Sequence, residues 1–211
     1  MKVLVTPLVT GAAATLLGLS GCNVYREATS AQPDVTQPWR GIATDSDRDR
    51  LRAWRKAWDE ALPLAKAADA AAIAADPALF DPDRALAGAA LPPGKYRCRT
   101  FKLGASGTAA RDYTAYPAFD CEVREEGEID SLRKINGVQR PVGLLFPETD
   151  ARTIFLGTLL LGDETSPLRY GLDAQRDMIG YVERIDEKRW RLVLPRPHFE
   201  SKLDILELVP A

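Results

Sequence analysis

Apolar and polar positions along the chain follow two different periods, and the change falls near residue 91. Between residues 39 and 90 apolar side chains recur every third or fourth position, which is the period of a helix with one buried face. From residue 91 onward they alternate with polar ones, which is the period of a half-buried strand. Helices followed by consecutive strands predict an α+β fold rather than an alternating parallel sheet.

The helical part carries one strong apolar stripe. Its members are Leu51, Trp54, Trp58, Ala61, Leu62 and Ala65. The stripe predicts an amphipathic helix over residues 46–62, with Thr44 in a capping box before it. Pro63 should end or kink this helix, because proline lacks the backbone N–H that a helix interior needs. We expect an alanine-rich second helix over 64–75 and a short third one over 82–86.

The second part contains eight candidate strands joined mostly by short connections. They span residues 94–103, 117–125, 129–135, 138–146, 152–162, 177–185, 188–195 and 202–209. Asn136-Gly137 is a strong two-residue hairpin signal between the third and the fourth. Eight antiparallel strands can close into a barrel, which removes exposed sheet edges. We therefore predict an antiparallel, eight-stranded β-barrel with amphipathic helices packed on it.

Two strands indicate how the helices and the barrel fit together. The strand over 152–162 is apolar on both faces, so it needs cover outside the barrel as well as inside. The tryptophan stripe is the natural cover, which makes helices and barrel one domain. In the strand over 188–195, Trp190 and its alternate neighbours point one way while Arg189 and Arg191 point the other, which predicts one solvated face.

Cys98 and Cys121 lie on two successive candidate strands, each at the centre of a charged triplet, Arg-Cys-Arg and Asp-Cys-Glu. If the two cysteines face each other, the flanking charges form the pairs Arg97–Glu122 and Arg99–Asp120. Opposite charges across strands stabilise the pairing, and an exported chain oxidises such thiols readily. This predicts a Cys98–Cys121 disulfide; the alternative is two free thiols, one of them reactive.

The first residues predict export and lipidation. Lys2 precedes an apolar run over residues 3–19 that is marginal for a membrane span and typical of a secretory signal. Leu-Ser-Gly-Cys, ending at Cys22, resembles the bacterial lipobox. That resemblance implies a lipoprotein signal peptide over 1–21 and acyl chains on Cys22, which would hold the protein on the membrane. The alternative is an ordinary signal peptide with a chance cysteine.

Beyond Cys22 we expect a flexible tether over 22–38 and a single folded domain over 39–211, helical over 39–90 and barrel-forming over 91–211. By resemblance to lipoprotein sorting rules, Asn23 implies delivery to the outer membrane, facing the periplasm of a bacterial cell envelope. A net charge of −2 with acids and bases interspersed argues against a nucleic-acid partner.

Recognisable catalytic chemistry is scarce. The chain has one histidine, His198, and neither a phosphate-binding glycine loop nor histidines at metal-ligand spacing. We therefore assign no catalytic residue, metal or cofactor.

One polar cluster near the end of the chain is a candidate binding rim at one end of the barrel. It consists of Tyr170, Asp173, Arg176, Asp177, Glu183, Arg184, His198 and Glu200. Two interpretations stay open: a site for a polar head group or a partner loop, or a salt-bridged rim that closes the barrel. An enzyme using Asp177, Glu183 and His198 is the alternative function.

Several stretches together resemble an uncharacterised alphaproteobacterial family, domain of unknown function 4893. They are TDSDRDRLRAWRKAW, LPPGKYRCRTFKLG, YPAFDC, QRPVGLLFPE, FLGTLLLGDE, RDMIGYVERI and RWRLVLPRPHFES. The resemblance runs from about residue 39 to the C-terminus and implies no catalytic residues. More loosely, Gly94-Lys-Tyr96 resembles the Gly-x-Trp start of lipocalin-like (calycin) barrels, and a small disulfide-linked periplasmic barrel resembles bacterial metalloprotease inhibitors.

These observations favour a non-catalytic binding module on the outer membrane. Its expected partners are the membrane, through the acyl chains on Cys22, and either an envelope protein or a small apolar ligand.

Overall fold

The computed structural model describes residues 38–107 and 111–211. The predicted signal peptide, Cys22 and nearly all of the predicted tether lie outside these residues. Residues 37–211 cluster as one compact unit.

Five short helices come first in the described chain. They are α2 (Pro38–Ile42), α3 (Asp45–Arg52), α4 (Trp54–Ala68), α5 (Ala70–Ala74) and α6 (Pro77–Phe80). The Thr44 side chain caps α3 by accepting a hydrogen bond from the Asp47 backbone N–H at 3.2 Å, as its sequence predicts.

Two details of the helix prediction are wrong. The helix expected over 46–62 breaks at Ala53 into α3 and α4, and α4 continues through Pro63. Pro63 lies on the exposed side of α4, where water can replace the lost backbone hydrogen bond while the buried side holds the helix in place. No helix forms over 82–86; instead Asp76 caps α6 further back, and the Leu86 N–H donates to the Arg184 carbonyl at 2.8 Å.

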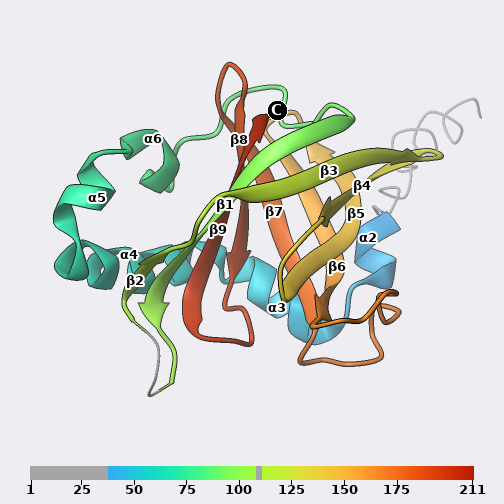
Figure 1. The fold of residues 1–211 in the computed structure, drawn as a ribbon, viewed down its shortest axis with the longest axis horizontal. Coiled ribbons are helices and arrows are strands. Elements are labelled where there is room, and N and C mark those ends of the chain that lie inside the picture. Colours follow the sequence, from blue (N-terminus) through green and yellow to red (C-terminus); the bar gives the residue numbers. More distant parts are fainter. Residues whose placement is uncertain (1–37, 108–110) are drawn as a thin grey trace, which may run out of the picture. The chain divides into compact units, whose positions relative to one another are not determined.

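Nine strands follow. They are β1 (Gly94–Ala105), β2 (Tyr113–Ala115), β3 (Phe119–Glu126), β4 (Ile129–Lys134), β5 (Gln139–Thr149), β6 (Arg152–Leu161), β7 (Asp177–Asp186), β8 (Arg189–Pro195) and β9 (Ser201–Pro210). Each pairs antiparallel with the next in the order β1, β3 to β9, and β9 pairs back onto β1. The eight-stranded closed barrel is thus confirmed (Figure 1), with β2 as an extra short strand on β1.

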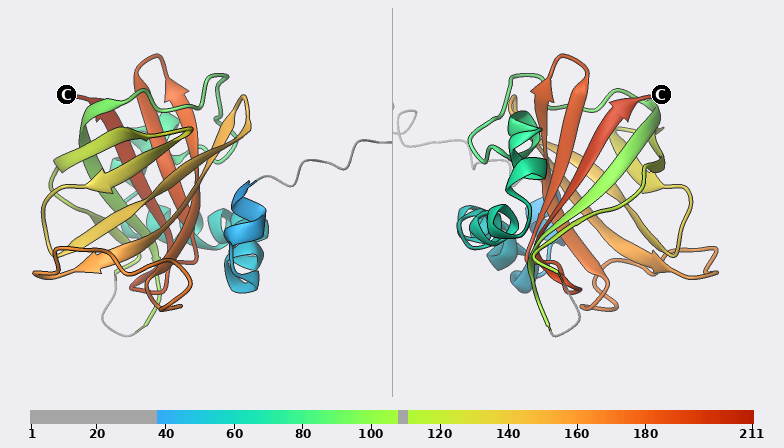
Figure 2. Two further views of the ribbon diagram at one scale, coloured as in Figure 1. Left: turned by 90° about the vertical axis from the view of Figure 1, so that its right-hand side faces the viewer. Right: turned by 60° about the vertical axis from the view of Figure 1, so that its left-hand side comes forward.

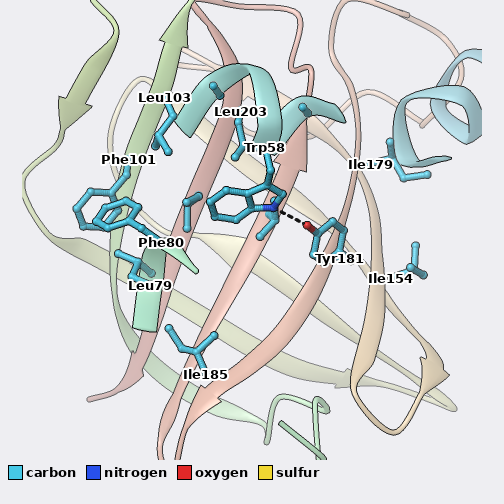
Figure 3. Close-up of a cluster of buried hydrophobic side chains, with 14 of the residues drawn as sticks. Trp58, Leu79, Phe80, Phe101, Leu103, Ile154, Ile179, Tyr181, Ile185 and Leu203 are labelled. Carbon is cyan, nitrogen blue, oxygen red and sulfur yellow. Dashed lines mark hydrogen bonds between the residues drawn. The ribbon is translucent and has the colours of Figure 1, made fainter. Parts of the chain in front are cut away.

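The helices pack against one side of the barrel wall (Figure 2). Trp58 on α4 is fully buried there, and its indole Nε1 donates a hydrogen bond to the Tyr181 hydroxyl of β7 at 2.8 Å (Figure 3). Ala61 approaches β1 so closely that a Cβ on Gly104 would lie 3.0 Å from its Cα. The predicted packing of the helices on the barrel is confirmed, but α3 and α4 contact chiefly β1, β7, β8 and β9, while Ile154 and Leu156 of β6 belong to the same buried cluster.

The outer face of β8 is not solvated, contrary to the sequence-based prediction. Arg191 is fully buried beneath the segment 79–84 and forms a salt bridge with the buried Glu183 at 2.7 Å. Its guanidinium also donates to three backbone carbonyls of that segment, at Leu79, Asp81 and Arg84. The charge therefore fastens this segment to the barrel rather than facing water.

Cys98 and Cys121 form the predicted disulfide, with Cα atoms 6.0 Å apart. The predicted register is wrong by two residues, because Cys98 lies opposite Phe119 and Cys121 opposite Tyr96. Both cysteines still point into the barrel, so the bond joins them diagonally. A disulfide barrel is consistent with an extracytoplasmic protein.

The charged neighbours of the cysteines change partners accordingly. Arg97 pairs with Asp120 at 3.0 Å, whereas Glu122 binds Arg133 of β4 at 2.6 Å. Arg99 donates to the backbone carbonyl of Tyr116 rather than to Asp120. The long connection between β1 and β3 leaves the register without a tight turn to fix it, so the charge pattern alone could not predict it.

Candidate functional site

The two ends of the barrel differ in how their interiors are filled. At the end where β1 begins, buried side chains from several strands close the interior, among them Leu91, Tyr96, Phe155, Trp190 and Leu208. At the other end, the lower one in Figure 1, the interior opens into a cavity of about 730 Å³. This volume lies within the roughly 300–1,000 Å³ typical of small-molecule sites.

The cavity has a charged side and an apolar side. One group of its charged residues comes from β9, β1 and β4 and from the loop before β9, with β3 lying between β1 and β4: Lys102, Lys134, Glu200 and Asp204. The arc from β5 to β8 contributes mainly apolar side chains, among them Pro141, Leu159, Met178 and Leu194, with Gln139 and Asp177 at the strand ends. Such a division suits a ligand that is itself partly polar and partly apolar.

Lys102 and Asp204 form a buried ion pair on the charged side. The Lys102 Nζ lies 2.9 Å from Asp204 Oδ2 and 3.5 Å from Glu200 Oε2. Burial acts to lower the pKa of Lys102, but the Asp204 carboxylate outweighs it and leaves that pKa above its ordinary value. Burial raises the pKa of Asp204, against the opposing effect of Lys102. Each of the two groups thus favours the charged form of the other.

Lys134 is the second ammonium group inside the mouth. It occupies an inward position of β4 opposite Cys121, and its Nζ lies 3.9 Å from the centroid of the Phe119 ring. Burial lowers its pKa, and the positive charge of Lys102 lowers it further. Among the described residues no carboxylate lies within salt-bridge distance of this ammonium.

The rim of the mouth is lined by exposed apolar side chains, namely Tyr116, Val138 and Phe199. The loop between β8 and β9 contains Arg196 and Glu200, the only non-glycine residues with positive φ in the described chain. Arg196 forms a salt bridge with Glu60 of α4 at 2.8 Å, which ties the loop to the helices. Strained backbone of this kind concentrates at functional sites.

Four of the eight predicted rim residues line this cavity: Arg176, Asp177, His198 and Glu200. Burial raises the pKa of Asp177, whose carboxylate accepts the Gly171 N–H at 3.0 Å. Burial, together with Arg50, lowers the pKa of His198, which favours its neutral imidazole.

One protein-family model matches most of this chain. The family model described as Domain of unknown function (DUF4893) matches residues 39–208. The chain belongs to this family. No curated protein and no solved structure matches it. In this member of the DUF4893 family the match includes every helix from α3 onward, the strands β1 to β8 and β9 as far as residue 208.

The other four predicted rim residues of this DUF4893 domain lie elsewhere. Asp173 lies beside the mouth and pairs with Arg176 at 3.4 Å. Tyr170 contacts Asp47 and the Thr44 N–H of the helical part; burial and the Asp47 hydrogen bond raise its pKa to about 12.

Glu183 and Arg184 are remote from the mouth. Glu183 is on the outer face of β7, fully buried against Arg191 and Arg152. Arg184 lies at the closed end, opposite Trp190 and next to Gly88. The structure therefore does not bring Glu183 together with Asp177 and His198, which the enzyme alternative required.

Sequence reasoning missed the two lysines of the mouth in the DUF4893 domain. A signal for Lys102 was present, because it follows Tyr96, Cys98 and Thr100 on the alternating inward face of β1. Lys134 carried no comparable signal, because it ends a short, largely charged strand.

No cluster of histidine, cysteine and acidic side chains within 38–107 and 111–211 has the geometry to bind a metal ion. None of the helices in that part of the chain is long and apolar enough to span a membrane.

Proposed function

We propose that this protein is a non-catalytic binding module that holds one small molecule in the mouth of its β-barrel. The observation that carries the proposal is the cavity of about 730 Å³, open at one end and closed by packed side chains at the other. The interior of a closed eight-stranded barrel is just wide enough either to be filled by its own side chains or to hold one small ligand. Here the end near His198 is hollow.

The apolar arc of the cavity supports an apolar or amphipathic ligand. Leu159, Met178 and Leu194 line this part of the cavity with hydrocarbon. Each methylene group of a ligand that leaves water for such a surface contributes about 0.8 kcal/mol. An apolar body of a few carbons would therefore already give measurable affinity.

We further propose that the protein acts in the envelope of an alphaproteobacterium, anchored to the outer membrane by acyl chains on Cys22 and facing the periplasm. The lipobox-like ending before Cys22 and the Asn23 that follows it support the anchor. The Cys98–Cys121 disulfide supports an oxidising compartment.

Native mass spectrometry tests ligand binding most simply. The chain from Asn23, which keeps every described residue, is exported to the periplasm and purified without detergent. We expect a co-purifying mass that disappears on denaturation. The substitution Leu159→Trp, which fills the cavity, should abolish that mass, because the indole occupies the ligand's place.

The control for this experiment is Leu144→Trp, which adds the same side chain to β5 at a position outside the cavity where Leu144 is 38% exposed. This variant should keep the bound mass. Equal retention by the Leu159→Trp and Leu144→Trp variants, or no bound mass in wild type together with no binding of added amphiphiles, would contradict the proposal.

A further inference from the structure

Lys134 differs from the other cations that line the cavity. Arg50, Lys102 and Arg176 each form a salt bridge, with Asp47, Asp204 and Glu164 respectively. Within the described residues Lys134 has no such carboxylate, although it lies at an inward position of β4. The barrel therefore presents one uncompensated ammonium to the cavity.

The surroundings of Lys134 favour an anion beside it. The Phe119 ring covers one side of its Nζ at 3.9 Å, and the charge that most affects it is the positive charge of Lys102. Asp204 and Glu200, the carboxylates nearest to Lys102, are both engaged by Lys102. A negative group next to Lys134 would stabilise an ammonium that burial and a like charge now disfavour.

The wall made by β5 to β8 sets the second requirement. Its cavity-lining side chains are mainly apolar, including Pro141, Leu159 and Met178; the exceptions are Gln139 at the start of β5 and Asp177 at the start of β7. Val138 and Phe199 continue the apolar lining out to the rim. A molecule that fills the mouth therefore contacts Lys134 with one part and hydrocarbon with the rest.

Building on the proposed function, we propose that the ligand is an amphipathic anion. Its carboxylate or phosphate head group is bound by Lys134 Nζ, and its apolar chain lies along the wall formed by β5 to β8. Lys102 contributes its positive charge at longer range while staying paired with Asp204.

Isothermal titration calorimetry on the chain from Asn23 tests this assignment with three probes of equal chain length. Dodecanoate and dodecyl phosphate carry an anionic head, and dodecanol carries none. All three are used as monomers, below the concentration at which they form micelles. A charge-assisted hydrogen bond in a partly dry site predicts that at least one anion binds about tenfold or more tightly than dodecanol.

Three variants separate the charge of Lys134 from its bulk. Lys134→Met, which keeps the length of the side chain, should weaken binding of the preferred anion about tenfold and leave dodecanol unchanged. Lys134→Arg should keep the preference for the anion. Lys188→Met, which removes an exposed lysine at the β7–β8 turn, should change nothing.

The outcomes distinguish this inference from the proposal it rests on. If dodecanol binds as tightly as both anions and Lys134→Met alters none of them, the anion assignment is overturned while the binding module stands. If no probe binds to wild type, both are overturned. Selective binding of one anion supports the inference and identifies the head group as carboxylate or phosphate.

Discussion

At the scale of single residues, the barrel contains two kinds of buried charge with different consequences. Lys102 and Asp204 neutralise each other inside the mouth, and Glu183 and Arg191 do so beneath the segment 79–84. Breaking such a pair costs more than the pair itself contributes, because an uncompensated charge is left in a dry environment. Lys134 lacks an intrachain partner of this kind, which is why a ligand is the natural place to look for its counter-charge.

The substitution Lys102→Met should therefore destabilise the protein by about 3–5 kcal/mol at neutral pH, because it leaves the buried Asp204 carboxylate without its counter-charge. The effect depends on pH. Burial raises the pKa of Asp204 in the folded state above that of the unfolded chain. A group whose pKa is raised on folding contributes stability that is fully present below its unfolded-state pKa. This stability is lost as the pH rises through the folded-state pKa.

Urea denaturation at several pH values measures this. The Lys102→Met variant should come closest to wild type in acid and fall furthest below it near neutrality. The double variant Lys102→Met with Asp204→Leu should recover most of the lost free energy of unfolding at neutral pH. A single variant that matches wild type at every pH would show that Asp204 is not desolvated in the fold.

At the scale of secondary-structure elements, alternation predicted eight of the nine strands, with ends near those observed. It failed for β2, a strand of three residues that is too short to show a period. The helix ends were less predictable. Pro63 predicted a break, but α4 continues through it because an exposed position tolerates proline. The real break, at Ala53, has no glycine or proline to mark it.

Half of the predicted rim reached the mouth, and one member of the other half, Glu183, missed it because of strand geometry. Neighbouring residues of a strand point to opposite faces, so Glu183 and Val182 separate although they are adjacent in sequence. Val182 packs inside the barrel, whereas Glu183 faces the segment 79–84. The density of charged residues in the sequence does not show which face of a strand each residue occupies. The alternation of residues around Lys102 could have shown it.

The segment 79–84 offers a test at this scale, since its attachment depends on Arg191. The substitution Arg191→Met removes hydrogen bonds to the Leu79, Asp81 and Arg84 carbonyls and leaves Glu183 with Arg152 alone. We expect a loss of about 3–5 kcal/mol in the free energy of unfolding. Amide hydrogen exchange should also become faster in this segment than in the barrel strands.

Arg189→Met is the matched control, two residues away on the same strand. Arg189 pairs with Asp76 and Glu207, but all three side chains keep contact with water, so the expected loss is at most about 1 kcal/mol. Equal losses in the two variants would contradict the view that Arg191 is the buried attachment point.

At the scale of the whole molecule, the barrel is stabilised by two separate groups of buried side chains, one inside it and one between its wall and the helices. Trp58 and its neighbours cover the wall, so the interior does not have to supply all of the hydrophobic stabilisation. The closed end is packed, and the mouth can remain hollow without loss of the fold. This division of roles links the architecture to binding.

The most direct test of this account is a crystal structure of the chain from Asn23, exported to the periplasm and purified without added amphiphile. We expect electron density for a non-protein molecule in the mouth, with a polar end at Lys134 Nζ and the remainder against Leu159 and Met178. A mouth filled by its own side chains, or one that holds only water and stays so after soaking with dodecanoate and dodecyl phosphate, would contradict it.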